Sequence, residues 1–141
     1  GYWQAPDLTA AAHSKDGWYK TGDVGRLDEE GALYVVDRKK DMYISGGENV
    51  YPAEVENVLA TFPEIAQSAV VGVPDSKWGE TGHAVIVLKA GHHLDGDIVT
   101  QRCTEQLAKF KVPKHVSFTD ELPRSGQGKV LKIELRKTYA G

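Results

Sequence analysis

The chain has 141 residues, the length of one domain, since domains commonly contain roughly 100–150 residues. Its net charge of −3 offers no electrostatic reason to bind nucleic acid or an anionic membrane. The single cysteine, Cys103, excludes an intrachain disulfide and a cysteine-based zinc cluster. The longest apolar run, residues 84–88, is too short to cross a bilayer, and no secretion signal is recognisable. We therefore expect a cytoplasmic protein.

The first part of the chain predicts a hairpin but no core. Residues 1–21 are polar and aromatic and show neither helical nor strand periodicity. Apolar segments at 23–27 and 32–36 then flank a four-residue connection, where Gly31 suits the left-handed position of a hairpin turn. A lone hairpin is marginally stable in water, so we expect this one to need a sheet to pack against.

A compact mixed domain is predicted after the charged run 37–41, which is itself typical of a solvated linker. Strands alternate with helices there, which favours an α+β or α/β domain with a sheet flanked by helices. The expected elements are a helix beginning at Pro52, buried strands at 69–73 and 83–88, a helical stripe of Val99, Cys103, Leu107 and Phe110, a strand at 116–118, and a terminal helix with Leu131, Leu135 and Tyr139.

Common catalytic and metal-binding patterns are absent from the sequence. The segment Gly-Gln-Gly-Lys at 126–129 is not a Walker phosphate loop, because Pro123 and Val130 stand where that pattern needs Gly and Ser or Thr. The five histidines lack the spacing of metal ligands, so no metal site is predicted.

Four ordered blocks carry a family resemblance that covers essentially the whole chain. They are Trp-Tyr-Lys-Thr-Gly-Asp at 18–23, the run 37–56, Leu-Ala-Lys-Phe-Lys-Val-Pro at 107–113, and Leu-Pro-Arg-Ser-Gly-Gln-Gly-Lys at 122–129. These blocks resemble the late core motifs of the acyl-adenylate-forming enzymes. Within that superfamily, Ser-Gly-Gly-Glu-Asn-Val-Tyr-Pro at 45–52 looks most like acyl- or aryl-CoA ligases.

The resemblance implies a fold, a reaction and a partner. Residues 1–37 would be the hairpin tail of a large N-terminal domain, and residues 38–141 a mobile C-terminal α+β domain with a three-stranded sheet, flanking helices and a β-hairpin. The implied reaction joins a carboxylic acid to CoA, converting ATP to AMP and pyrophosphate, with Mg²⁺ arriving on ATP. The phosphate loop and acyl pocket would lie in the N-terminal domain, so we expect this stretch alone to be inactive.

The resemblance also implies residue roles on the ATP side. Lys129 matches the catalytic lysine of adenylation, Asp23 the aspartate that binds both ribose hydroxyls, and Arg38 an arginine that reaches the nucleotide. Lys40 matches the hinge about which the small domain rotates between the two half-reactions. Judged from the residues alone, Lys129 is a surface lysine in a Gly-rich turn, Asp23 a turn residue, and Arg38 one more charge in a linker.

Further residues match the CoA side of the family. Gly46-Gly47 would approach the pantetheine arm, where small residues let a backbone lie against a ligand, although a tight hairpin turn explains them equally well. Phe110 would stack on adenine, and Lys111 and Lys114 would pair with phosphates. Trp78 is either near the same nucleotide or an ordinary half-buried tryptophan.

The sequence is also compatible with two other functions. The chain could be a domain that binds a nucleotide or a partner without catalysis, which requires residues 1–36 to pack stably by themselves. It could also belong to an adenylating enzyme that delivers its acyl group to a carrier protein. Consumption of CoA in step with AMP release would distinguish a CoA ligase from the second of these.

Overall fold

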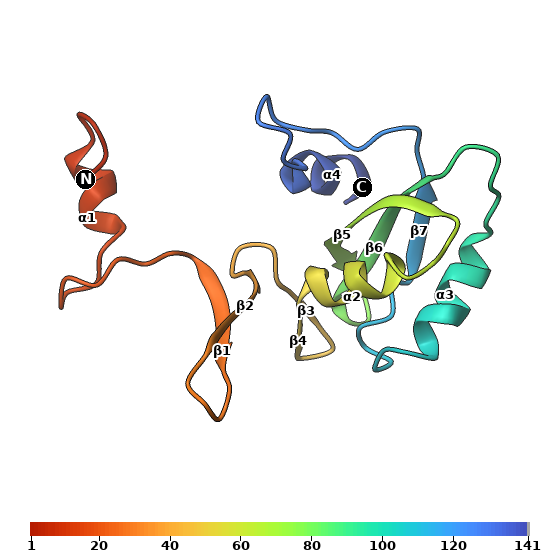
Figure 1. Ribbon diagram of the computed structural model, residues 1–141, viewed down its shortest axis with the longest axis horizontal. Helices are drawn as coiled ribbons and strands as arrows, with labels where there is room; N and C mark the ends of the chain where they lie inside the picture. The colour runs from red at the N-terminus through yellow and green to blue at the C-terminus, as the bar shows by residue number, and fades with distance from the viewer. Residues whose placement is uncertain (141) are drawn as a thin grey trace. The chain divides into compact units, whose positions relative to one another are not determined.

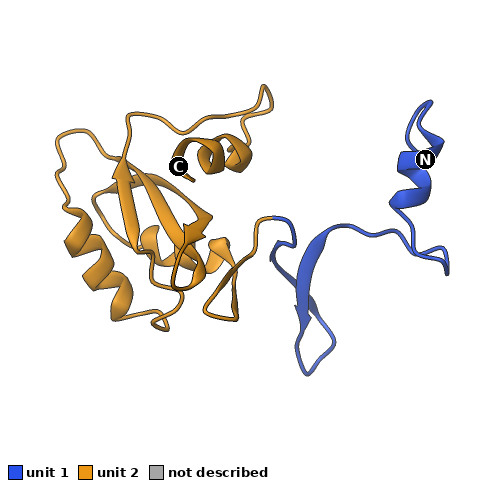
Figure 2. Ribbon diagram, turned by 180° about the vertical axis from the view of Figure 1, so that it is seen from behind, with its two compact units in different colours: residues 1–40 blue, residues 41–141 orange. Residues whose placement is uncertain are grey.

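The structure is a computed structural model that describes residues 1–140 (Figure 1). The chain divides into two compact units, Gly1–Lys40 and Asp41–Gly141, which Figure 2 shows in different colours. The sequence predicted a boundary between residues 37 and 38, so the observed division falls slightly further along the chain.

The first unit consists of one short helix and one hairpin. Helix α1 (Pro6–Ala11) begins with proline, which suits the first helical position. Strand β1 (Asp23–Leu27) pairs antiparallel with β2 (Leu33–Arg38), and Gly31 holds a left-handed φ of 83° in the turn, so the predicted hairpin is confirmed. Residues 1–21 contain α1 despite their lack of periodicity, because a helix of 6 residues without a buried face leaves no hydrophobic repeat.

The second unit is built on one five-stranded sheet. Its long antiparallel pair, β5 and β6, is joined by β7 parallel to β6 and by the β3–β4 hairpin, through a pairing of Ser45 with Gly79. The predicted α+β class is confirmed. The expected hairpin and the expected three strands belong to one sheet, because Ser45 of the hairpin pairs with Gly79 of β6. The strands are β3 (Tyr43–Ser45), β4 (Glu48–Val50), β5 (Ile65–Asp75), β6 (Gly79–Leu88) and β7 (His115–Phe118).

Helices pack on both faces of this sheet (Figure 1). Neighbouring residues of β5 point to opposite faces: Val70 belongs to the cluster formed with α2 and α3, whereas Ala69 and Val71 pack with Leu135 of α4. Because both faces are covered, β5 is a continuous apolar run where a half-exposed strand would alternate. The helices are α2 (Pro52–Leu59), α3 (Gly96–Thr104) and α4 (Lys132–Tyr139).

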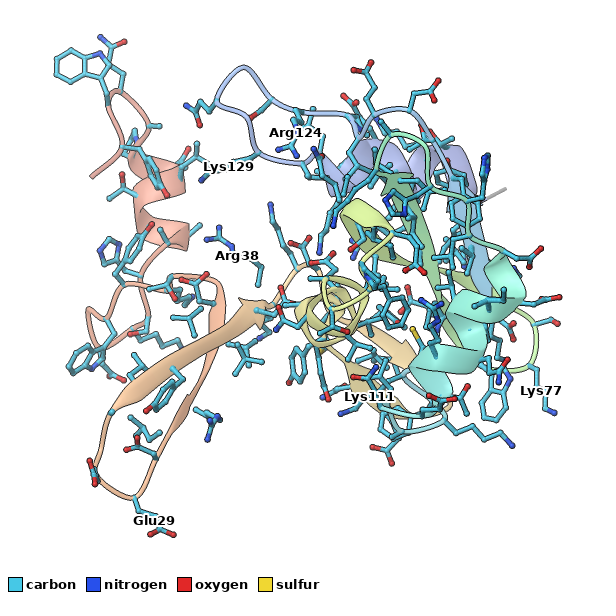
Figure 3. The ribbon with its side chains drawn as sticks, turned by 45° about the vertical axis from the view of Figure 1, so that its right-hand side comes forward. Glu29, Arg38, Lys77, Lys111, Arg124 and Lys129 are labelled. Carbon is cyan, nitrogen blue, oxygen red and sulfur yellow. The ribbon has the colours of Figure 1, made fainter. Side chains whose placement is uncertain are left out.

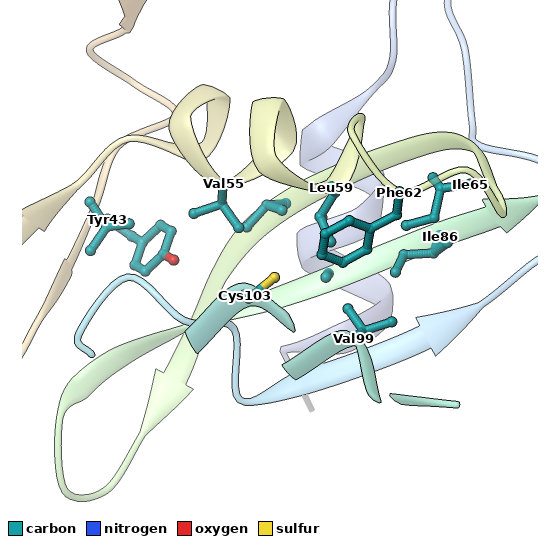
Figure 4. Packing of buried hydrophobic residues seen from close by; sticks show 11 residues of the cluster. Tyr43, Val55, Leu59, Phe62, Ile65, Ile86, Val99 and Cys103 are labelled. Carbon is teal, nitrogen blue, oxygen red and sulfur yellow. The ribbon is translucent and has the colours of Figure 1, made fainter. Parts of the chain in front are cut away.

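The larger core cluster lies between the sheet, α2 and α3 (Figure 4). Val55 and Leu59 from α2 and Val99 and Cys103 from α3 are all completely buried in it. Burial raises the pKa of the Cys103 thiol to about 11, so this cysteine stays protonated at neutral pH. The prediction that Cys103 is a core thiol is confirmed.

Three apolar residues assigned to helices by their spacing lie outside them. Helix α3 ends at Thr104, so the prediction that Leu107 and Phe110 continue its stripe is wrong. Both side chains still pack against the larger cluster, because a turn after the helix folds them back onto it. Leu131 likewise precedes α4 as its N-cap residue. A helical spacing of apolar residues therefore shows here that they pack on a core, but not that one helix contains them all.

The ring of Tyr43 fixes the β3–β4 hairpin on the sheet. It lies against Gly72 and Gly82, which are paired on β5 and β6, and a Cβ at either position would overlap the tyrosine. Its hydroxyl is buried without a hydrogen-bond partner among the described residues, and this burial raises its pKa well above the usual value. The two glycines thus allow the close approach that sets the position of the Gly46-Gly47 turn.

Candidate functional site

The two residues predicted to meet the nucleotide lie side by side in the first unit. Asp23 and Arg38 are register partners on β1 and β2, and Arg38 Nη1 lies 3.0 Å from Asp23 Oδ1. The backbone around them is held by a 2.8 Å bond from Lys39 N–H to the Gly22 carbonyl. Both side chains keep access to solvent, so this ion pair adds little stability and can exchange partners with a ligand.

Lys40 is the last residue of the first unit. It is exposed and lies in the turn that follows β2, where the chain passes to the second unit at Asp41. A backbone change in an exposed turn costs little packing, which suits the predicted hinge position.

Lys129 ends a tight turn that its own backbone bonds define. Ser125 N–H donates to the Lys129 carbonyl at 2.8 Å, and Gly128 N–H donates to the Ser125 carbonyl at 2.8 Å. Gly128 has a φ of 82°, a conformation that favours glycine. The Lys129 side chain is exposed, and Figure 3 shows it on the loop that also carries Arg124. The lysine is therefore held on a defined backbone while its ammonium group stays accessible.

Two predicted CoA-side residues line one pocket of about 180 Å³ in the second unit. Its lining residues are Ser45, Trp78, Lys109, Phe110 and Lys114. The structure thus brings the two aromatic residues together and places two lysines beside them. This arrangement offers flat apolar surfaces for a ring and cations for phosphate groups.

The Gly46-Gly47 turn adjoins this pocket. Gly46 N–H donates to the Trp78 carbonyl at 2.9 Å, and a Cβ on Gly46 would overlap the Trp78 ring. Both glycines have positive φ, 61° and 88°, so the hairpin-turn interpretation is confirmed by the backbone. Among the described residues other than Gly47 and its two chain neighbours, no heavy atom lies within 4 Å of where a Cβ on Gly47 would stand, so there is open space at this point of the turn.

Lys114 and Trp78 are held beside each other by Asp75. The Lys114 ammonium lies 4.4 Å from the Trp78 ring centre and 3.9 Å from Asp75 Oδ2. The Asp75 carboxylate also accepts hydrogen bonds from the backbone N–H groups of Trp78 and Lys77, which lower its pKa and keep it ionised. This carboxylate, which no sequence pattern indicated, fixes the orientation of the tryptophan backbone.

Lys111 has a different environment from Lys109. The Lys111 ammonium lies 2.6 Å from Glu54 Oε1 and 2.9 Å from Glu54 Oε2, and it is not among the pocket's lining residues. Lys109, which no sequence pattern marked as a ligand, lines the pocket instead. The two lysines flank Phe110 symmetrically in the sequence, so only the fold distinguishes them.

Comparisons with known proteins identify the family of the chain. A sequence model of the AMP-binding enzyme C-terminal domain family matches residues 54–129. The chain belongs to this family. Feruloyl-CoA synthase from an Amycolatopsis species is 52% identical over 139 residues, which make up 99% of this chain and 28% of that protein.

Two further relatives extend the comparison. The 3-[(3aS,4S,7aS)-7a-methyl-1,5-dioxo-octahydro-1H-inden-4-yl]propanoyl:CoA ligase of Rhodococcus jostii is 55% identical over 97% of this chain and 27% of its own length. The crystal structure of ATP-bound MatB from Rhodopseudomonas palustris superposes with a TM-score of 0.91 at 44% identity, over 99% of this chain and 28% of that chain. The chain thus spans little more than a quarter of each relative.

The family match covers only part of the candidate site. Phe110, Lys114 and Lys129 lie inside the matched range of the AMP-binding enzyme C-terminal domain, whereas Asp23 and Arg38 precede it. Among the described residues, no group of three or more His, Cys, Asp or Glu side chains is arranged to hold a metal ion. None of the helices in residues 1–140 has the length and apolar character needed to span a membrane.

Proposed function

We propose that this chain is the C-terminal part of an ATP-dependent acyl-CoA synthetase, working with a larger N-terminal domain of the same enzyme. The observation that carries the proposal is the pocket between Trp78 and Phe110, flanked by Lys109 and Lys114. CoA ends in an adenine ring with phosphate groups, and aromatic faces beside ammonium groups are suited to both parts. The family membership and the names of two relatives, a feruloyl-CoA synthase and a CoA ligase, support it.

In the first half-reaction, a carboxylate oxygen attacks the α-phosphorus of ATP and pyrophosphate leaves, giving an acyl-adenylate. Negative charge builds on the phosphate oxygens, and Lys129 supplies the cation that stabilises it. Asp23 accepts hydrogen bonds from the ribose hydroxyls, because a carboxylate can take two donors at once, and Arg38 reaches the same nucleotide. Mg²⁺ enters with ATP and is held by its phosphates.

In the second half-reaction, the CoA thiol attacks the acyl carbonyl, the bond to AMP breaks, and the thiol proton is released. The Gly46-Gly47 turn lies along the pantetheine arm, while Phe110, Lys109 and Lys114 take up the nucleotide end. Lys111 pairs with a phosphate of CoA by leaving Glu54. Rotation about Lys40 exchanges the Lys129 turn for this CoA-binding surface between the two steps. The chain by itself is inactive under this proposal, because the ATP phosphate loop and acyl pocket belong to the N-terminal domain.

The division of labour is tested by Lys129→Ala in the full-length enzyme that contains this chain. Adenylation, measured as pyrophosphate release, should fall by about a hundredfold or more, because one charge-stabilising group is lost. Thioester formation from supplied acyl-adenylate should be largely unchanged. Lys137→Ala, which removes an exposed lysine of α4, is the matched control. Equal loss in both half-reactions would contradict the role given to Lys129.

The size of the native protein tests whether the chain acts as part of a larger enzyme. An antibody to this domain should detect, in the source cell, a band several times heavier than 15.4 kDa. A band at 15.4 kDa would contradict the proposal and favour a binding domain without catalysis. In the active enzyme, CoA consumption in step with AMP release separates a CoA ligase from an enzyme that loads a carrier protein.

A further inference from the structure

The guanidinium group of Arg124 joins the Lys129 turn to the sheet. Its Nη1 donates to the Gly128 carbonyl, one residue before Lys129, and its Nη2 donates to Gln67 Oε1 at 2.7 Å. One planar group therefore bonds the turn with one nitrogen and strand β5 with the other (Figure 3 labels Arg124 and Lys129). The fork of an arginine can hold two acceptors in a fixed geometry, which a lysine ammonium cannot do.

A β-bulge at the start of β5 makes this connection possible. Ile65 pairs with Leu88 and Gln67 pairs with Val87, so one strand carries an extra residue at this point. Without the bulge, Ile65 and Gln67 would face the same side of the sheet. Instead, Ile65 packs in the cluster with α2 and α3, while Gln67 is exposed and reaches Arg124. Bulges redirect side chains in this way and are frequent beside functional sites.

The segment around the turn is also fixed on its other side. Leu131 N–H donates to the Pro123 carbonyl at 2.8 Å, closing the base of the loop. Lys132 Nζ lies 2.8 Å from Glu56 Oε1, which attaches the start of α4 to α2. The backbone of the turn is therefore shaped by its own hydrogen bonds and tied to the domain at both ends, with Arg124 holding the end nearest Lys129.

We propose that Arg124, seated on Gln67 at the bulge of β5, is the positioning residue that holds Lys129 in place for the adenylation half-reaction. This inference rests on the proposed function of Lys129. Arg124 acts through the Gly128 carbonyl and does not itself touch the substrate. A small misplacement of a charge-stabilising group can cost up to about a hundredfold in rate, so a surface hydrogen bond of modest stability can matter for catalysis.

The main test is Arg124→Lys in the full-length enzyme. The lysine keeps the charge but loses the clamp, by which we mean the two hydrogen bonds of Arg124 to the Gly128 carbonyl and to Gln67. Pyrophosphate release in single turnover should slow by about tenfold or more, while the KM for ATP and the rate of thioester formation from supplied acyl-adenylate stay unchanged. Normal adenylation would overturn the proposal. An equal slowing of both half-reactions would also overturn it, because it would show a general loss of structure.

Variants at two glutamines separate the clamp from other effects. Gln67→Ala removes the support on β5 and should slow adenylation by roughly two- to tenfold, the effect of one hydrogen bond. Gln127→Ala is the matched control, because among residues 1–140 its side chain has no hydrogen-bond partner and its backbone N–H bonds Ser125 Oγ within the turn. An effect of Gln127→Ala equal to that of Gln67→Ala would contradict the clamp.

The double variant Arg124→Lys with Lys129→Ala distinguishes failure of this inference from failure of the proposed function. If Arg124 acts only through Lys129, the double variant should adenylate no more slowly than Lys129→Ala alone. A further loss would overturn the positioning role. Normal adenylation by Lys129→Ala itself would refute the proposed function, whereas a slow Lys129→Ala beside a normal Arg124→Lys would refute only the clamp.

Discussion

The two units of this chain differ in how much buried core supports their candidate site residues. In residues 1–40, all of which the structure describes, no side chain is buried, and Leu33 of β2 is 69% exposed. In the second unit, Leu59 of α2 is completely buried within a cluster that the sheet and two helices share. The first unit therefore has local structure without a core, while the second has its own core. A hairpin alone is marginal in water, so the first unit by itself gives the Asp23–Arg38 pair little structural support.

Separating the units gives the largest expected effect. A peptide of residues 41–141 should unfold cooperatively on heating, whereas a peptide of residues 1–40 should show no cooperative transition, because it buries too little apolar surface to offset its chain entropy. Circular dichroism against temperature makes the measurement for both peptides. A cooperative transition in residues 1–40 would contradict the comparison and support the alternative of an independently packed binding domain.

A pair of leucine substitutions sharpens the comparison within the intact chain. Leu59→Ala should lower the free energy of unfolding by about 2–5 kcal/mol, since it removes a completely buried side chain and leaves a cavity. Leu33→Ala should change it by no more than about 0.5 kcal/mol, because that side chain is already in water. Urea titration of both variants gives the two values. Similar losses would mean that Leu33 is buried in solution.

Acid should lower the folding stability of the second unit, by less than separating the units or truncating Leu59. His83 is buried, bonds Ser117 at 2.9 Å and contacts the rings of His115 and Tyr139. Burial, followed by repulsion from His115, lowers the pKa of His83 to about 4, below the value near 6.5 of an unfolded chain. The unfolded state binds the proton more readily, so stability should be full above about pH 6.5 and decline toward pH 4, with a loss on the order of 2 kcal/mol between pH 7 and pH 5.

Urea midpoints at pH 7 and pH 5 test this dependence. His83→Gln removes the titrating group and should lose less stability between these two pH values than the natural sequence does. His13→Gln, in the first unit, serves as the control and should leave the loss unchanged. An identical loss in the His83 variant would assign the acid sensitivity to other groups.

Local sequence patterns predicted most of the fold. A helix beginning at Pro52, the buried apolar strands and the hairpin turn at Gly31 were correct, because each depends on periodicity or on a residue-specific backbone preference. The helical stripe extended to Phe110 was wrong, and the short helix α1 was missed. Leu107 and Phe110 kept the helical spacing because residues in a turn can pack on the same core as a helix. Helix α1 left no hydrophobic repeat because none of its residues is buried.

The candidate site was less predictable than the fold. The sequence could name Lys111 but could not show that Glu54 engages it, or that Lys109 lines the pocket instead. It gave no sign that Asp75 would hold Trp78 beside Lys114. The catalytic and binding roles stay predictions for the experiments above.

By itself, the sequence determined which residue types were present and where the chain would turn. It placed a flexible glycine before Lys129, a pair of glycines at 46–47 and apolar residues where strands would be buried on both sides. Only the tertiary structure decided which side chains meet. Gln67 reaches Arg124 because a bulge shifts the alternation of β5. Lys111 pairs with Glu54, whereas Lys109, two residues earlier, lines the pocket beside Trp78. Such contacts join residues far apart in the chain, and no local preference encodes them.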